Sequence, residues 1–195
     1  MGVFPNAFPI TERSFAATVC SRMKNEFESN YESVSGSLAV EKIRALTKSA
    51  RFCLFGTDLS HPPVTVRPMT VESVDDSGNL WFLSGRTSHI NQHIAGDSQV
   101  QLFFTNPGTA EFLTLEGTAT ISDDAASRNE HWTPIAKTWF PDGVDDPNLT
   151  VIKVNPREGY YWDTKHGKTL STLKIMFGAV TGKTLTAGVE GPVHL

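Results

Sequence analysis

The chain has 195 residues, of which 39% are hydrophobic and 19% charged, and its formal net charge is -4. This composition predicts one globular domain with a sizeable core, and the acidic balance gives no reason to expect binding to nucleic acid or to an anionic membrane surface. The two cysteines, Cys20 and Cys53, have neither Cys-x-x-Cys nor zinc-ligand spacing, and no apolar run approaches the roughly 20 residues of a membrane span, so we expect a cytoplasmic protein without a disulfide framework or a metal site.

The first residues differ in composition from the rest of the chain. Residues 1–36 mix Pro, Ser, Asn and Glu with scattered aromatic side chains, and we interpret them as an N-terminal extension of uncertain order before a single domain over 37–195. Leu38, Ile43 and Leu46 then fall near one helical face, with Ser37 as a candidate N-cap. This spacing predicts a short amphipathic helix over 38–49.

Strand-like segments dominate the rest of the chain, and clusters of Gly, Pro, Asn and Asp separate them. We expect two helical insertions, one over 88–95 with Ser88 as its cap and one over 125–138. Short strands with few helices predict a mainly β fold with peripheral α-helices, in the form of a small closed or partly open barrel. The predicted strands cover residues 51–58, 63–70, 80–84, 100–105, 112–122 and 151–163, and 174–181 is a further candidate.

Two separated motifs carry groups suited to a phosphate. Arg67-Pro68-Met69 ends one predicted strand, and Thr87-Ser88-His89 opens the helix after the next long strand. A guanidinium, a hydroxyl and an imidazole in these places can converge on a phosphate group. Taken alone, Arg67 is also consistent with a surface ion pair and Ser88 with an ordinary helix cap.

Other cofactor sites have no support in the sequence. His89 and His93 are spaced to share a helix face, but no third ligand with suitable spacing accompanies them, so we expect no metal site. The chain contains no Gly-x-Gly-x-x-Gly motif and no P-loop, which argues against a Rossmann or Walker nucleotide site.

Taken together, these segments resemble the FMN-binding split-barrel superfamily that includes the pyridoxamine 5'-phosphate oxidases, and specifically its general stress protein branch. The resemblance covers about residues 38–168. It rests on the order and spacing of six segments, which are residues 50–55, 66–69, 80–84, 87–89, 139–147 and 160–163.

The resemblance implies a split β-barrel of Greek-key type and a homodimer with FMN at the subunit interface. Arg67, Ser88 and His89 would hold the flavin phosphate, and the isoalloxazine ring would lie along two strands. Trp162 would pack near the flavin of the partner subunit, although core packing is an equal alternative for a strand Trp. The implied cofactor-binding residues are Arg67, Pro68, Met69, Thr70, Phe82, Leu83, Ser84, Thr87, Ser88, His89, Phe112 and Trp162.

The chain also departs from the oxidase pattern. His89 replaces a lysine, Phe112 replaces a glutamine near the flavin, and Glu72 replaces a lysine that would hold the substrate phosphate. Carboxylates also stand where further basic contacts are expected, and they would repel a phosphorylated substrate. These carboxylates are Asp142, Asp145 and Asp146.

We therefore expect an FMN-dependent oxidoreductase of the general stress branch that is not a true pyridoxamine-phosphate oxidase. No catalytic acid or base can be nominated from the sequence. The alternatives are a non-catalytic flavin-binding stress protein, acting as a carrier, sensor or store, and a haem-binding relative with the same fold.

Overall fold

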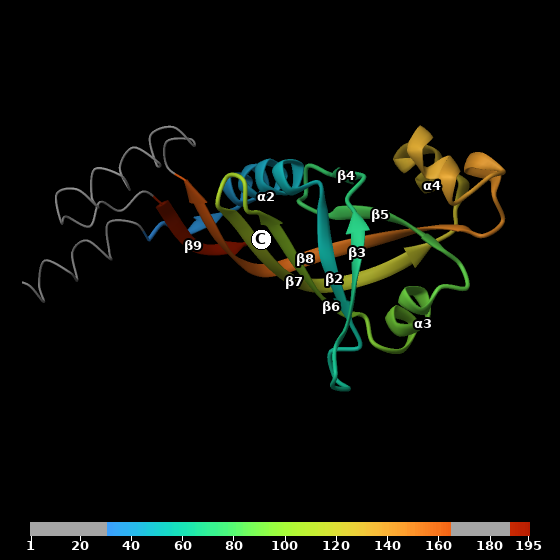
Figure 1. Cartoon of the computed structure of the whole chain (residues 1–195), viewed down its shortest axis with the longest axis horizontal. Coiled ribbons are helices and arrows are strands. Elements are labelled where there is room, and N and C mark those ends of the chain that lie inside the picture. The colour runs from blue at the N-terminus through green and yellow to red at the C-terminus, as the bar shows by residue number, and fades with distance from the viewer. Residues whose placement is uncertain (1–30, 165–187) are drawn as a thin grey trace, which may run out of the picture.

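The computed structural model describes residues 31–164 and 188–195, which form a long coiled sheet with helices packed around it (Figure 1). Its strands form one nine-stranded sheet, in which β1-β9-β8-β7-β6-β2-β3 are neighbours in that order, while β5 pairs with β8 and with β4. The strands are β1 (Val34–Ser35), β2 (Phe52–Thr57), β3 (Thr65–Thr70), β4 (Ser73–Val74), β5 (Leu80–Gly85), β6 (Gln99–Asn106), β7 (Glu111–Ser122), β8 (Leu149–Thr164) and β9 (Gly188–His194).

The long strand β8 organises the sheet. On one side it pairs with β7, and on the other side its first half pairs with β5 and its second half with β9. Gly117 on β7 lies at a register shift of this ladder, and a Cβ there would stand 2.3 Å from the Asn155 carbonyl oxygen. Glycine therefore permits the close approach of the two strands at the bulge.

The sheet is not closed. In the part of the chain that the structure describes, β3 pairs only with β2, and no ladder joins β3 to β5. Pro68 lacks a backbone N-H, which suits the position of β3 at an edge of the sheet. The predicted mainly β class with few helices is confirmed, but the described strands form an open sheet.

Helices pack around the sheet. They are α2 (Ser37–Ala50), α3 (His89–Gly96), α4 (Ala125–His131) and two short 3-10 helices, η1 (Pro134–Thr138) and η2 (Gly143–Asp145). The predicted helix over 38–49 is confirmed, but Ser37 is its first residue and Gly36 stands at the N-cap without a side-chain bond. Ser88 does cap α3, as predicted.

The predicted helix over 125–138 is wrong in its second half. α4 ends at His131, and Thr133 takes an extended conformation before Pro134 begins η1. A proline disfavours helical geometry in the residue before it, which explains the break. The chain therefore turns here, and η1 packs separately.

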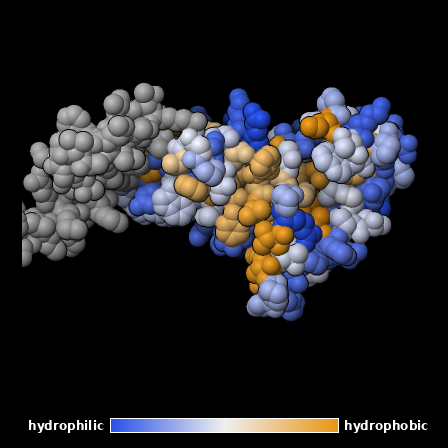
Figure 2. Space-filling view, viewed as in Figure 1, coloured by the Kyte–Doolittle hydropathy of each residue, from blue (hydrophilic) through white to orange (hydrophobic). Residues whose placement is uncertain are grey.

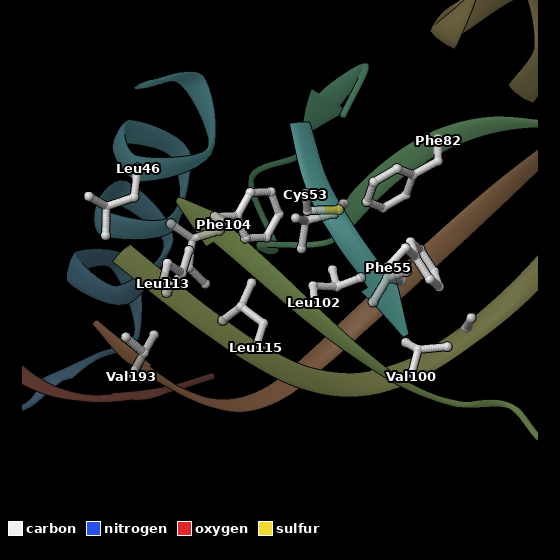
Figure 3. Close-up of a cluster of buried hydrophobic side chains, with 14 of the residues drawn as sticks. Leu46, Cys53, Phe55, Phe82, Val100, Leu102, Phe104, Leu113, Leu115 and Val193 are labelled. Carbon is white, nitrogen blue, oxygen red and sulfur yellow. The ribbon is translucent and has the colours of Figure 1, made fainter. Parts of the chain in front are cut away.

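Two cores hold these parts together. The main core joins the buried face of α2 to the inner faces of β2, β5, β6, β7 and β8, and Phe55 and Phe82 meet in it edge to face with centroids 5.1 Å apart (Figure 3). Cys53 lies in this core, where burial raises the pKa of its thiol to about 12, so the thiol stays protonated. A smaller core of Ala136, Phe140 and Leu149 fixes η1 against β8 and β5.

The structure adds strands that the sequence analysis did not predict. β1 pairs in parallel with β9, so residues 34–35 of the expected N-terminal extension belong to the sheet. The candidate strand over 174–181 lies outside the described residues. Within the described ranges no helix is long and apolar enough to cross a membrane.

Candidate functional site

A cleft of about 770 Å³ opens where the sheet is split, between β3 and β5, with α3 at one end and η1 at the other. Its volume lies within the range of about 300 to 1,000 Å³ that is usual for small-molecule and cofactor sites. Most of the residues predicted to bind a cofactor line this cleft. They are Arg67, Pro68, Met69, Thr70, Leu83, Ser84, Ser88 and His89.

Arg67 reaches the cleft from the inner side of β3, where its cross-strand neighbour is the fully buried Phe55. One guanidinium nitrogen donates to the Thr57 hydroxyl at 3.4 Å, and the same hydroxyl lies 3.0 Å from Nδ1 of His93. Burial lowers the pKa of Arg67 from its ordinary value, but a guanidinium remains charged at neutral pH. Thr57 thus holds one nitrogen of the Arg67 guanidinium, and the other N-H groups of Arg67 stay available for a ligand.

The second cationic feature is the start of α3. The Ser88 hydroxyl accepts a hydrogen bond from the backbone N-H of Asn91 at 3.4 Å. His89 is the first residue of the helix, and its exposed side chain lies at the edge of the cleft. The first amides of a helix have no intrahelical acceptors and carry partial positive charge. With Arg67 on the opposite wall, this end of the cleft suits an anion.

A buried polar network holds α3 in place. The Ser84 hydroxyl lies 2.7 Å from Oδ1 of Asn91 and 2.9 Å from the Thr150 hydroxyl, and Asn91 also donates to Thr150 at 2.9 Å. All three side chains are buried, so these bonds tie α3 to β5 and β8 at once. Ser84 therefore forms part of the cleft wall, but its hydroxyl is already hydrogen-bonded to Asn91 and Thr150.

The structure does not bring the remaining predicted residues to the cleft. Phe82 is fully buried in the main core because side chains alternate along β5 and its neighbour Leu83 faces the other way. Thr87 is exposed, and its carbonyl oxygen accepts from Gln92 at 3.2 Å. Phe112 and Trp162 are direct cross-strand neighbours on the outer face of β7 and β8.

The far end of the cleft contains side chains to which the sequence analysis gave no role in binding. Ile135, Ala136, Trp139 and Phe140 line it from η1 and the residues that follow, together with Asn148. Trp139 belongs to a segment that carries the family resemblance, but nothing local in the sequence indicates that it approaches β3. Pro134, which follows α4, is the one local sign in the sequence that the chain turns before η1.

Glu72 is the only one of the expected substrate-repelling carboxylates that lines the cleft. Its carboxylate accepts a hydrogen bond from the Thr133 hydroxyl at 3.0 Å, and burial raises its pKa although that bond lowers it. Asp142 and Asp145 are exposed outside the cleft, and the buried Asp146 accepts from the Asn148 amide at 2.9 Å. Of the four carboxylates expected near a substrate, Glu72 alone lines the cleft.

The described residues contain no group of three or more His, Cys, Asp or Glu side chains that could hold a metal ion. His93, the candidate partner of His89, instead contacts the Thr57 hydroxyl.

The chain belongs to the pyridoxamine 5'-phosphate oxidase-like family, whose sequence model matches residues 19–186. Among curated proteins, it is 26% identical over 129 residues to protein bli-3 of Neurospora crassa, and the match spans 62% of this chain and 62% of bli-3.

Solved structures of general stress proteins share the fold. A candidate general stress protein 26 from Jannaschia sp. CCS1 has a TM-score of 0.69 at 22% identity, covering 82% of this chain and all of that one. The general stress FMN/FAD binding protein of Xanthomonas citri has a TM-score of 0.56 at 26% identity, covering 65% of this chain and 88% of that one. A heme binding protein from Mycobacterium smegmatis has a TM-score of 0.51 at 16% identity, covering 63% and 53%.

Proposed function

We propose that this chain is an FMN-binding protein of the general stress branch of its family, and that the cleft between β3 and β5 holds the flavin. The observation that carries the proposal is the convergence of Arg67 and the start of α3 on one end of a cleft of cofactor size. A guanidinium, a capping hydroxyl, helix amides and an imidazole form a donor set suited to a phosphate. The FMN/FAD-binding neighbour from Xanthomonas citri supports the choice of a flavin.

The protein's part in such a site is to bind and orient. Arg67 and the α3 terminus hold the phosphate end, and Met69 and Leu83 offer apolar contacts to the ring. The network of Ser84, Asn91 and Thr150 keeps α3 at a fixed distance from the sheet. The bound flavin would supply the electron transfer, which makes an oxidoreductase our leading proposal over a carrier, sensor or store.

We further propose that the split barrel is completed as a homodimer, with the outer face of the sheet as the interface. Large apolar side chains stand exposed on this face, and Figure 2 shows apolar residues gathered over β2 and β3. Cross-strand pairing joins β2, β6, β7 and β8 into one surface that also carries Phe112 and Trp162. This position is consistent with Trp162 approaching the flavin of the partner subunit.

The proposed activity is not that of a pyridoxamine-phosphate oxidase. Glu72 is a half-buried carboxyl in the cleft and would repel a phosphate dianion there. The FMN-loaded protein should form no pyridoxal 5'-phosphate from the pyridoxine or pyridoxamine phosphates under conditions where an authentic oxidase does.

An absorbance spectrum of the purified protein, followed by titration with FMN and with riboflavin, tests the flavin proposal. We expect Arg67→Ala to weaken FMN by about 1.5 to 3 kcal/mol, the usual value for a hydrogen bond to a charged group, and to leave riboflavin nearly unchanged. Arg86→Ala is the matched control, because Arg86 forms its ion pair with Asp123 at 2.8 Å and does not line the cleft.

Three results would contradict this assignment. Equal weakening of FMN and riboflavin would give Arg67 a structural role, and no binding of either ligand would remove the flavin proposal. A Soret band on reconstitution with haem would favour the haem-binding alternative. Anaerobic stopped-flow mixing of the FMN-loaded protein with NADPH or NADH separates an oxidoreductase, whose flavin is reduced, from a non-catalytic flavin protein.

A further inference from the structure

The two ends of the cleft differ in chemistry. Arg67, Ser88 and His89 lie at one end, whereas Glu72 and Trp139 belong to the other. Arg67 donates to Thr57, which also contacts His93 of α3. Glu72 lies two residues beyond the end of β3 and accepts from Thr133, the residue before η1. The η1 end therefore forms a subsite separate from the end that would hold the phosphate.

Apolar and aromatic surface dominates this subsite. Ile135 and Trp139 are 67% and 66% exposed, while Ala136 and Phe140 on the same segment are buried in the small core. The buried pair fixes the segment, so the exposed pair is presented at the cleft without being needed for packing. An indole face held in this way can stack on a planar ring or on a cation.

Negative charge is the second property of the subsite. The Glu72 carboxyl lines it, and Thr133 fixes this carboxyl with a hydrogen bond of 3.0 Å. Lys137, the basic residue of η1, is exposed and does not line the cleft. A ligand at this end therefore meets an aromatic face and a carboxyl group, and no lysine is among the described residues that line the cleft.

We propose that the η1 end of the cleft is the substrate subsite, and that it accepts a planar aromatic cation whose ring stacks on Trp139 and whose charge faces Glu72. This inference rests on the proposed flavin site, since the subsite would present its ligand to a ring bound along β3. It gives the protein a substrate class opposite in charge to a phosphorylated pyridoxine.

The test uses the FMN-loaded full chain and two bicyclic probes, the 1-methylquinolinium cation and the 1-naphthoate anion. Binding is followed by calorimetry and by the change in visible flavin absorbance. We expect the cation to bind about tenfold more tightly than the anion, because the carboxylate attracts one probe and repels the other. Trp139→Ala should weaken the cation about three- to tenfold, and Trp139→Phe should restore most of the loss.

Glu72→Gln should bring the affinities of the two probes close together. Asp145→Asn is its matched control, since Asp145 is an exposed carboxylate in η2 that does not line the cleft, and the preference for the cation should survive this change. FMN affinity is measured for every variant, so that loss of flavin is distinguished from loss of probe.

Equal affinity for the two probes, or a Trp139→Ala variant that binds the cation as the wild type does, would overturn the subsite while the flavin proposal stands. Failure of the wild type to bind FMN would overturn both. Trp139 is exposed, so its variants test the inference even if Glu72→Gln fails to fold.

Discussion

His89 lines the cleft at the start of α3, where the resemblance places a lysine. A lysine ammonium is positively charged at neutral pH and offers three N-H donors to a phosphate, whereas a neutral imidazole offers one. We expect His89→Lys to tighten FMN binding at about pH 8 and to leave riboflavin affinity nearly unchanged. Titrations of the wild type and the variant with the two flavins measure the difference.

His61→Lys is a suitable control, because His61 is exposed and bonds to Asp58 away from the cleft. Equal FMN affinities of the wild type and His89→Lys would show that His89 does not touch the phosphate.

Glu72 makes a prediction that requires no ligand. Burial raises the pKa of its carboxyl above 4.5, so the folded protein holds this proton more tightly than the unfolded chain does. The resulting stabilisation is complete at low pH and is lost as pH rises through the folded-state pKa. We expect the wild type to lose stability relative to Glu72→Gln as pH rises from about 4 through the folded-state pKa of this carboxyl.

Urea unfolding of both flavin-free proteins over this pH range is the measurement. A stability difference that stays constant with pH would mean that Glu72 is as well solvated in the folded protein as in the unfolded chain.

Individual side chains show how far the sequence could predict the site. The alternation along β5 indicates that Phe82 and Leu83 face opposite ways, but only the packed structure assigns Phe82 to the core and Leu83 to the small core near η1. The sequence could indicate that Arg67 lies on a strand and that Ser88 caps a helix, although Arg67 stands within β3 and not at its end as predicted. Their convergence requires the coiling of the sheet, which local patterns do not encode.

The start of α3 combines a helix cap with the proposed phosphate contact, and Ser88→Asp separates these two roles. Asp caps helices about as well as Ser and also favours the positive end of the helix dipole, so thermal stability should be unchanged or slightly higher. A carboxylate at this place should nevertheless repel the phosphate, so FMN affinity should fall while riboflavin affinity stays close to that of the wild type.

Ser88→Ala completes the comparison, because it loses the cap at a cost of about 0.5 to 2 kcal/mol but adds no charge. Thermal unfolding and the two flavin titrations cover all three proteins. If Ser88→Asp bound FMN more tightly than Ser88→Ala, the phosphate would not lie at this helix.

Helices and strands were predictable to different degrees. The long periodic segments, such as α2 and β7, match their predicted ranges closely, whereas the break after His131 required weighing Pro134 against a helical pattern. β9 carries an alternating signal, with Val189, Gly191 and Val193 buried, but glycine and proline within it resemble a turn. The pairing of Glu72 with Thr133 joins residues 61 positions apart, and no local rule predicts it.

The outer face of the sheet connects the single chain to the proposed dimer. Phe52 and Leu54 are 60% and 50% exposed on β2, and β-sheet pairing places Leu54 between Pro68 of β3 and Phe103 of β6. Exposed apolar surface of this kind marks an interaction site in most proteins. A second copy of the chain is the occupant that the family resemblance implies.

We therefore expect the wild type to be a dimer in analytical ultracentrifugation and Leu54→Asp to shift it towards monomer, because burying an unpaired carboxylate in an apolar interface is costly. Leu38→Asp is the matched control, since Leu38 is 62% exposed on α2, away from this face, and its variant should remain dimeric. FMN affinity should fall with Leu54→Asp, because Trp162 would no longer reach the flavin of its partner. A monomeric wild type that binds FMN tightly would instead show that one chain completes the site and that the apolar face serves another contact.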